Sequence, residues 1–205
     1  MPWIMDTIAG AVAHDLSGRI VSDLPWERLP GYFKAPLEED LPLDIQMSDA
    51  PKILPEFSSL ADGNHFVGEK ARSILEEFCP GVLSFHAVRV RMPNKQLYKD
   101  KVYLLTMGDS CLIEDGIVME GSDVVLKRSR IPLADGRSVE GRPMLGVLKR
   151  PPQLYWSRVA VGDRHLWADS KLRQIVVASD GLHEAFKAHG VTGYQAQECR
   201  FVLEH

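Results

Sequence analysis

Apolar residues recur at helical spacing in two short stretches of the chain. In residues 69–78, four apolar side chains fall on one face of a helix: Ala71, Ile74, Leu75 and Phe78. After Ser179, which is a good N-cap residue, the same spacing returns in the run Leu182, Ala185, Phe186 and His189. A glycine of the kind that ends helices follows each stretch, at Gly81 and Gly190. The pattern therefore predicts one helix over 69–78 and a second between Ser179 and Gly190.

Strands are predicted around these helices by two kinds of apolar pattern. Over residues 85–92 apolar and basic residues alternate, as in a strand with one buried face: Val88, Arg89, Val90, Arg91 and Met92. Continuous apolar runs predict further strands at 65–67, 102–107, 124–126 and 172–178, and a last strand that ends near Phe201. The pair Asp115-Gly116, between the apolar residues 111–113 and 117–119, predicts a hairpin.

The order of these elements predicts an α+β fold with a mostly antiparallel sheet. Residues 65–90 and 175–201 each run strand, helix, turn, strand, and their apolar positions align after a two-residue gap. These two strand–helix–strand units are either copies of one ancestral unit or two independent examples of a common one. Two copies are too few for a repeat array.

Residues 20–60 are rich in proline, with aromatic and aliphatic residues between the prolines. Because proline fixes φ and lacks a backbone N–H, we expect neither a long helix nor a central strand here. A segment that wraps over the core is the expected structure. Its most charged part consists of Glu38, Glu39, Asp40 and Asp44. These acids form either a solvated loop or an acidic contact patch for a partner.

The same patterns divide the chain into three parts. Residues 1–60 are predicted to be the proline-rich segment packed on the core, and residues 61–202 the α+β domain. Within that domain, residues 127–152 are rich in Gly, Pro and basic side chains, so we expect an exposed basic insertion there. The last residues, 203–205, resemble the start of a histidine tag and receive no functional weight.

Composition and charge exclude several classes of protein. The chain has 205 residues, of which 45% are hydrophobic and 25% charged, the usual balance of a folded soluble domain. It contains no apolar run long enough to span a membrane. Its formal net charge of −4 lacks the basic excess typical of nucleic-acid-binding proteins. We therefore expect neither a membrane nor a nucleic acid as a partner.

The cysteines indicate a reducing compartment. Cys79, Cys111 and Cys199 are odd in number, far apart and in no CxxC pair, so free thiols are expected rather than disulfides or a zinc site. No basic segment precedes an apolar stretch near the N-terminus, which argues against a signal peptide. The predicted location is the cytoplasm.

No motif of a known catalytic or cofactor site is present. The chain lacks Gly-rich phosphate loops, the GxSxG nucleophile elbow and the HExxH zinc motif, so neither a cofactor nor a metal is expected. Ser179, Asp180 and His183 are the residue types of a catalytic triad, but Ser179 and Asp180 are better explained as the start of a helix. Asp163 and His165 form either an acid–base pair or part of a structural turn.

Three motifs near the C-terminus occur in a distinctive order. They are Arg164-His165-Leu166-Trp167, the run Ile175 to Leu182, and Ala188-His189-Gly190-Val191-Thr192-Gly193-Tyr194. Weaker motifs lie upstream in Leu41 to Asp44, Phe66 to Lys70, Pro80 to Val82 and Val102 to Leu105. Together they resemble a bacterial immunity protein family, typified by a myxobacterial member and formerly a domain of unknown function. The resemblance spans about residues 40–202. It departs from the family at Gly68, where a serine helix cap is expected, and in the length of the basic insertion.

The resemblance implies a protein that is not an enzyme and that protects the producing cell by binding a cognate toxin, such as one delivered by type VI secretion. The family shares neither catalytic residues nor fixed toxin-binding residues. Aromatic and arginine residues in exposed segments, together with acidic residues, are therefore the candidate contacts with the toxin: Trp26, Tyr32, Tyr155, Trp156, Arg158, Glu38, Glu39, Asp40 and Asp44. For the aromatic residues the alternative is packing in the core, which is expected for at least half of them. A homodimer is left open.

Two other functions are compatible with the residues. One is an enzyme with an unrecognised site around Asp163, His165 and Ser179, which clustered titratable groups in a deep pocket would indicate. The other is a small-molecule-binding domain with a pocket between the two strand–helix–strand units. A large apolar cavity with few polar groups would indicate that function.

Overall fold

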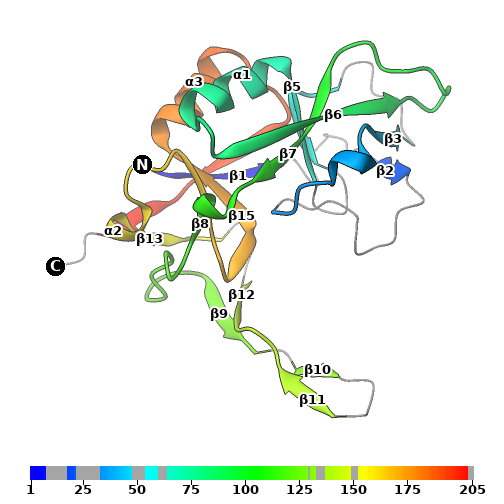
Figure 1. Ribbon diagram of the computed structural model, residues 1–205. Helices are drawn as coiled ribbons and strands as arrows, with labels where there is room; N and C mark the ends of the chain where they lie inside the picture. Colours follow the sequence, from blue (N-terminus) through cyan, green and yellow to red (C-terminus); the bar gives the residue numbers. More distant parts are fainter. Residues whose placement is uncertain are drawn as a thin grey trace.

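The computed structural model describes residues 1–7, 18–21, 33–47, 54–59, 64–128, 130–132, 137–148 and 152–202 (Figure 1). These residues form mainly β-strands together with three α-helices, which confirms the α+β class. Most strands pair in antiparallel fashion within two larger sheets and several two-stranded ladders.

One sheet has six strands in the order β2-β3-β6-β7-β5-β4. Its strands are β2 (Gly18–Val21), β3 (Leu43–Met47), β4 (Phe57–Ser59), β5 (His65–Gly68), β6 (Leu83–Arg91) and β7 (Val102–Met107). Its one parallel pair among the described strands is β3 with β6, where Leu43 lies opposite Val88. Every residue of β7 is buried, because this strand lies inside the sheet and both of its faces are covered.

A second sheet has five strands in the order β16-β1-β15-β14-β8. Its strands are β1 (Trp3–Thr7), β8 (Leu112–Ile113), β14 (Leu166–Asp169), β15 (Leu172–Ala178) and β16 (Tyr194–Glu198). Strand β1 pairs with β15 on one side and with β16 on the other. The beginning of the chain therefore lies between strands from its C-terminal quarter.

Two further ladders form an extension within residues 124–148, which we call the arm; the structure describes its residues 124–128, 130–132 and 137–148. Strand β9 (Val124–Lys127) pairs with β12 (Met144–Val147), and β10 (Arg130–Pro132) pairs with β11 (Ser138–Glu140). Figure 1 shows these ladders one after the other, extending away from the two main sheets. The last ladder joins β13 (Tyr155–Ser157) in parallel to β17 (Arg200–Val202), beside the root of the arm.

Two helices form where the sequence predicts them, α1 (Glu69–Phe78) and α3 (Asp180–Ala188), and they pack against each other (Figure 1). A third helix, α2 (Arg158–Val161), was not predicted. Ser179 Oγ accepts a hydrogen bond of 3.2 Å from the backbone N–H of Leu182, which confirms the predicted N-cap. Gly190 has a φ of +62°, in the left-handed region that favours glycine after a helix. Two short 3-10 helices, η2 (Glu38–Asp40) and η3 (Asp109–Cys111), lie in the connections.

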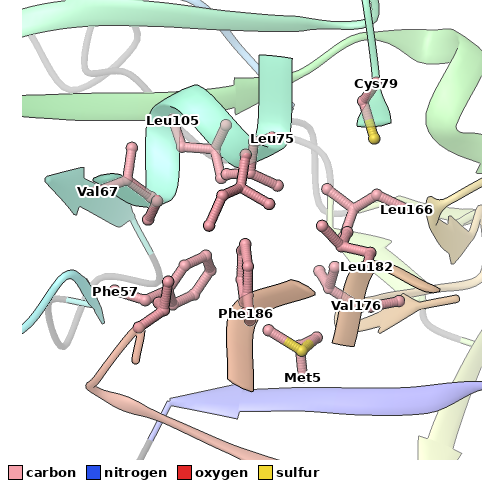
Figure 2. Close-up of a cluster of buried hydrophobic side chains, with 14 of the residues drawn as sticks. Met5, Phe57, Val67, Leu75, Cys79, Leu105, Leu166, Val176, Leu182 and Phe186 are labelled. Atoms are coloured by element: carbon pink, nitrogen blue, oxygen red, sulfur yellow. The ribbon is translucent and has the colours of Figure 1, made fainter. Parts of the chain in front are cut away.

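Three hydrophobic cores cover the faces of the sheets. The central core joins both sheets to the two helices: Figure 2 shows Met5, Val67 and Val176 from the strands meeting Leu75 of α1 and Phe186 of α3. Because side chains alternate along a strand, the neighbouring residues point into other cores. Ile4 and Val177 enter a second core with Trp156 and Trp167, and Phe66 enters a third with Leu104 and Ile45. Both main sheets are therefore buried on two faces.

The prediction that no central strand runs between residues 20 and 60 is wrong. Strand β3 pairs with β2 on one side and with β6 on the other. Pro42 and Pro51 lie outside Leu43–Met47, so every residue of the strand keeps its backbone N–H for pairing. The division of the chain at residue 60 stays a prediction, and the segment before it supplies strands to both main sheets.

The predicted hairpin at Asp115-Gly116 is also wrong. Strand β8 pairs in parallel with β14, whereas Ile117 forms an isolated antiparallel bridge with Trp156. The buried carboxylate of Asp169 accepts the backbone N–H groups of Gly116 and Ile117, at 2.8 and 3.2 Å. The turn is thus held by a side chain from another strand, and the two apolar runs beside it diverge.

Candidate functional site

The predicted contact residues lie in two separate regions. Four acidic residues belong to η2 and β3, whereas Tyr155, Trp156 and Arg158 belong to β13 and α2. Figure 1 shows β3 and α2 on opposite sides of the molecule. Trp26 and Tyr32 lie outside the described residues, as do residues 203–205. The structure therefore does not gather the described candidates on one surface.

In the acidic region, Glu38 and Glu39 are exposed on η2, whereas Asp44 is held in an ion-pair network. Asp44 accepts two hydrogen bonds from Arg89, from Nε at 2.8 Å and from Nη2 at 3.0 Å. Arg91 Nε lies 3.8 Å from the same carboxylate. The basic face predicted for β6 therefore neutralises Asp44. The exposed acidic charge of this region is concentrated on η2.

The other region contains one core residue and two side chains that reach the surface. Trp156 is 0% exposed and packs edge-to-face on Trp167, with ring centroids 5.9 Å apart. Its apolar ring lies in the second core, as the core-packing alternative expects, and a contact of Trp156 with a partner stays a prediction. Tyr155 is half-buried. Arg158 is 49% exposed, and its guanidinium carbon lies 5.1 Å from the centroid of the Phe201 ring.

A surface cavity of about 330 Å³ lies beside Arg158 and also touches Asp163, His165 and Ser179. His165 Nδ1 is 2.8 Å from Ser179 Oγ, so the structure does bring together two residues of the possible catalytic site. The same Oγ caps α3. Asp163 is fully exposed, and its carboxylate lies 3.9 Å from Nη2 of Arg158.

This arrangement lacks the third member of a catalytic triad. A triad needs a carboxylate that hydrogen-bonds the histidine and orients it. In the part of the chain that the structure describes, no carboxylate hydrogen-bonds His165. Arg164 is likewise occupied, because it donates to the backbone oxygens of Ser110, Ala160 and Val161 at 3.0 to 3.2 Å. The hydrogen bonds that Arg164 and Ser179 make beside the cavity therefore hold turns and a helix start in place.

Asp169 is a buried charge that sequence reasoning did not single out. It is 1% exposed, and it accepts backbone hydrogen bonds from Gly116, Ile117 and Lys171 at 2.8 to 3.2 Å. Three donors satisfy the carboxylate in an otherwise apolar region. The only sequence signal was an aspartate at the end of an apolar run. Its role is to join the turn after β8 to the turn between β14 and β15.

The three cysteines are free thiols, as predicted, and the structure shows that all three are buried. Burial raises the pKa of Cys79 to about 11 and the pKa values of Cys111 and Cys199 to about 12. A thiol with a raised pKa stays protonated and is a poor nucleophile or metal ligand. Across the described residues, no group of three His, Cys, Asp or Glu side chains is placed to hold a metal ion. No helix of the described ranges is long and apolar enough to cross a membrane.

Comparison with known families decides how these features are read. The model of the Imm11 immunity protein family matches residues 5–200, a range that includes both main sheets, the helices and the arm. The chain belongs to the Imm11 immunity protein family. The resemblance inferred from motif order is thereby confirmed, and the match begins upstream of residue 40. A search of curated proteins finds no match for this Imm11 protein. Its family points to a role in immunity against a toxin.

Proposed function

We propose that this Imm11 protein binds a cognate bacterial toxin in the cytoplasm and neutralises it by covering its active surface. The family match over residues 5–200 is the observation that carries the proposal. The toxin is proposed to be a polymorphic toxin, delivered by type VI secretion or by another route. The protein itself performs no reaction in this proposal. The structural roles of Ser179 and Arg164 support binding rather than catalysis.

Covering a toxin requires a broad surface rather than the single cavity beside Arg158. Stable complexes bury roughly 1,200–2,000 Å² in total, with a few side chains that dominate the affinity. Arg158 is the best placed of the predicted contacts, because Phe201 and Asp163 hold its exposed guanidinium in position. Tyr155, three residues earlier in β13, is a further proposed contact. Glu38, Glu39 and Asp40 on η2 are proposed to steer a basic toxin toward the complex.

Co-expression with the toxin encoded beside this gene tests the proposal directly. The expected result is that cells survive and that the two proteins purify as one complex. Continued killing of the cells, together with no co-purification, would contradict the proposed function.

Charge reversal tests the steering role of η2. The variant Glu38→Lys/Glu39→Lys should slow association with the toxin by about tenfold at low salt and change dissociation little. The control is Glu77→Lys/Glu198→Lys, which makes the same change of charge at exposed positions on α1 and β16. Equal association rates for the two variants would remove η2 from the interface.

Replacement of Arg158 tests the second region. Arg158→Ala should raise the dissociation rate of the complex by about tenfold or more if the guanidinium is an anchor. Val159→Ala is the matched control, because Val159 is the next residue of α2 and is 75% exposed. If both variants dissociate alike, the anchor lies elsewhere.

A small-molecule function has less support. A cavity of about 560 Å³ lies near the start of α1, but charged side chains line much of it, including Glu69, Lys70, Lys99 and Lys101. Ligand sites are usually lined mainly by apolar residues with a few convergent polar groups. This cavity also adjoins only one of the two helices that the alternative hypothesis places around a pocket.

A further inference from the structure

The arm exposes apolar side chains that a separate chain would be expected to cover. At its root, Val124 and Leu145 are each 6% exposed and pack into the second core. On the other face, Val125 is 39% exposed and Met144 is 38% exposed. Lys127 lies over Gly146, where a Cβ would come within 2.7 Å of Nζ. The ribbon is thus anchored by one face, and its other face is open to solvent.

Exposed apolar residues are concentrated at this arm within the described surface. Between residues 119 and 148 the large apolar side chains that are at least 38% exposed are Met119, Val125, Leu126, Val139, Met144 and Leu148. Elsewhere such residues are scattered over separate elements, as with Leu97 and Val159. In the β9–β12 ladder they lie on both faces, with Val125 and Met144 on the open face and Leu126 on the face of Val124 and Leu145, and these are the apolar contacts that the arm offers a partner.

Charge divides the chain into complementary parts. The arm contains five basic residues and two acidic residues, a net charge of +3. Since the whole chain has a net charge of −4, the residues outside the arm carry −7. Two arms brought together would repel each other, whereas an arm and the body of another copy attract each other.

An acidic turn beside the root of the arm carries the charge opposite to that of the arm. Residues 114–123 contain Glu114, Asp115, Glu120 and Asp123 and no basic residue. Asp115 is paired with Lys171, whereas Glu114 and Glu120 are exposed. Met119, next to Glu120 in the sequence, is 46% exposed. This turn therefore exposes two carboxylates and one apolar side chain.

The turn and the arm border one common cavity. It has a volume of about 510 Å³ and is lined by Glu114 from the turn and by Arg142 and Met144 from the arm. A twofold axis beside this cavity would place each patch of one copy opposite the complementary patch of the other. A second copy thus supplies both the charge and the apolar surface that the arm requires.

We propose that this protein forms a twofold dimer in which the arm of each copy crosses the acidic turn 114–123 of the other. Lys127, Arg128 and Arg142 of one copy face Glu114 and Glu120 of its partner. The apolar side chains of the arm pack around Met119 of the partner. This proposal does not depend on toxin binding.

Sedimentation of the purified full-length chain tests the proposal. A dimer is expected at about 50 mM salt, with a dissociation constant that rises about tenfold at about 500 mM salt, since the screening length becomes shorter. Lys127→Glu/Arg128→Glu and Glu114→Lys/Glu120→Lys should each weaken the dimer by about tenfold or more. The combination of all four substitutions restores opposite charges across the interface and should recover most of the affinity.

Controls separate the interface from folding and from the toxin. Val159→Ser changes an exposed apolar residue outside the arm and should leave the dimer intact, whereas Leu126→Ser should weaken it; circular dichroism verifies that each variant is folded. A monomer at all concentrations, or no recovery in the fourfold variant, overturns the proposal. Monomers whose arm variants lose toxin binding would also overturn it, because the occupant of the arm would then be the toxin.

Discussion

Glu56 supplies the helix cap that Gly68 lacks. Gly68 is the N-cap residue of α1 and has no side chain to cap it, and Glu56 Oε2 instead accepts the backbone N–H of Ala71 at 3.4 Å. A Cβ at position 68 would collide with this carboxylate, whose Cδ lies 2.9 Å from that point. The departure from the serine expected in the family is therefore explained by a cap from a distant residue.

Glu56 and a serine at position 68 would cap the same end of α1, so one should be able to replace the other. Glu56→Ala should lower the free energy of unfolding by about 1 kcal/mol, because a capping acceptor is lost. Gly68→Ser alone should also destabilise the protein, since its side chain meets Glu56. The double variant Glu56→Ala/Gly68→Ser should be more stable than either single variant, because serine then has room to cap α1. Urea unfolding followed by circular dichroism measures all three, and additive losses in the double variant would refute the exchange.

Asp169 should be among the most sensitive polar positions. Asp169→Ala leaves three backbone N–H groups without an acceptor, and we expect a loss of about 3 kcal/mol or more. Asp169→Asn keeps one carbonyl oxygen and should cost less. Chemical denaturation of both variants gives the comparison. Asp163→Ala is the control, because that carboxylate is exposed and should change stability little.

Phe186 tests whether α3 is part of the central core. Its side chain is 0% exposed and lies 6.4 Å from Phe57 and 5.4 Å from Tyr194, measured between ring centroids. Phe186→Ala should lower the free energy of unfolding by about 3–5 kcal/mol, since it removes a buried ring and leaves a cavity. Thermal or urea unfolding measures the loss. A cost near that of Val159→Ala, on the surface, would show that the ring is not buried in solution.

His65 should make the stability depend on pH. Burial lowers the pKa of its ring to about 4 in the folded protein, compared with 6.5 for the free side chain. The unfolded chain therefore binds the proton more readily, and stability present above pH 6.5 is lost as the pH falls toward 4. By pH 5 the loss from this residue is about 2 kcal/mol.

The variant His65→Gln isolates this effect from the titration of other groups. Between pH 7.5 and pH 5, the unfolding free energy of the native chain should fall by about 2 kcal/mol more than that of the variant. Parallel urea titrations at the two pH values provide the measurement. A difference that stays constant with pH would mean that His65 is not desolvated.

Helix positions could be predicted because their determinants are local. The apolar spacing in residues 69–78, the cap at Ser179 and the glycine at position 190 act over a few residues, and the structure contains all of them. The three free thiols also followed from the sequence alone. Strands β3 and β1 were missed, because a strand in the middle of a sheet depends on neighbours that are distant in sequence.

The surroundings of the candidate contact residues could not be predicted for the same reason: they depend on strands that are distant in sequence. Trp156 looks like an exposed anchor in the sequence, but a ring enters the core or reaches the surface according to the strand register, which the neighbouring strand sets. Asp44 looks like a free acid, and only its pairing with Arg89 across the parallel strands neutralises it.

The sequence by itself determined the α+β class, the helices α1 and α3 with the cap at Ser179, the free thiols and the immunity family, since these depend on local spacing or on the order of motifs. Tertiary structure alone decided the order of strands in each sheet and the roles of Glu56 and Asp169. It also decided that the two apolar runs beside Asp115 diverge instead of forming the predicted hairpin. Backbone N–H and carbonyl groups are alike at nearly every residue, so pairing between distant segments leaves little trace in the sequence. It is chosen by how side chains from the whole chain pack together.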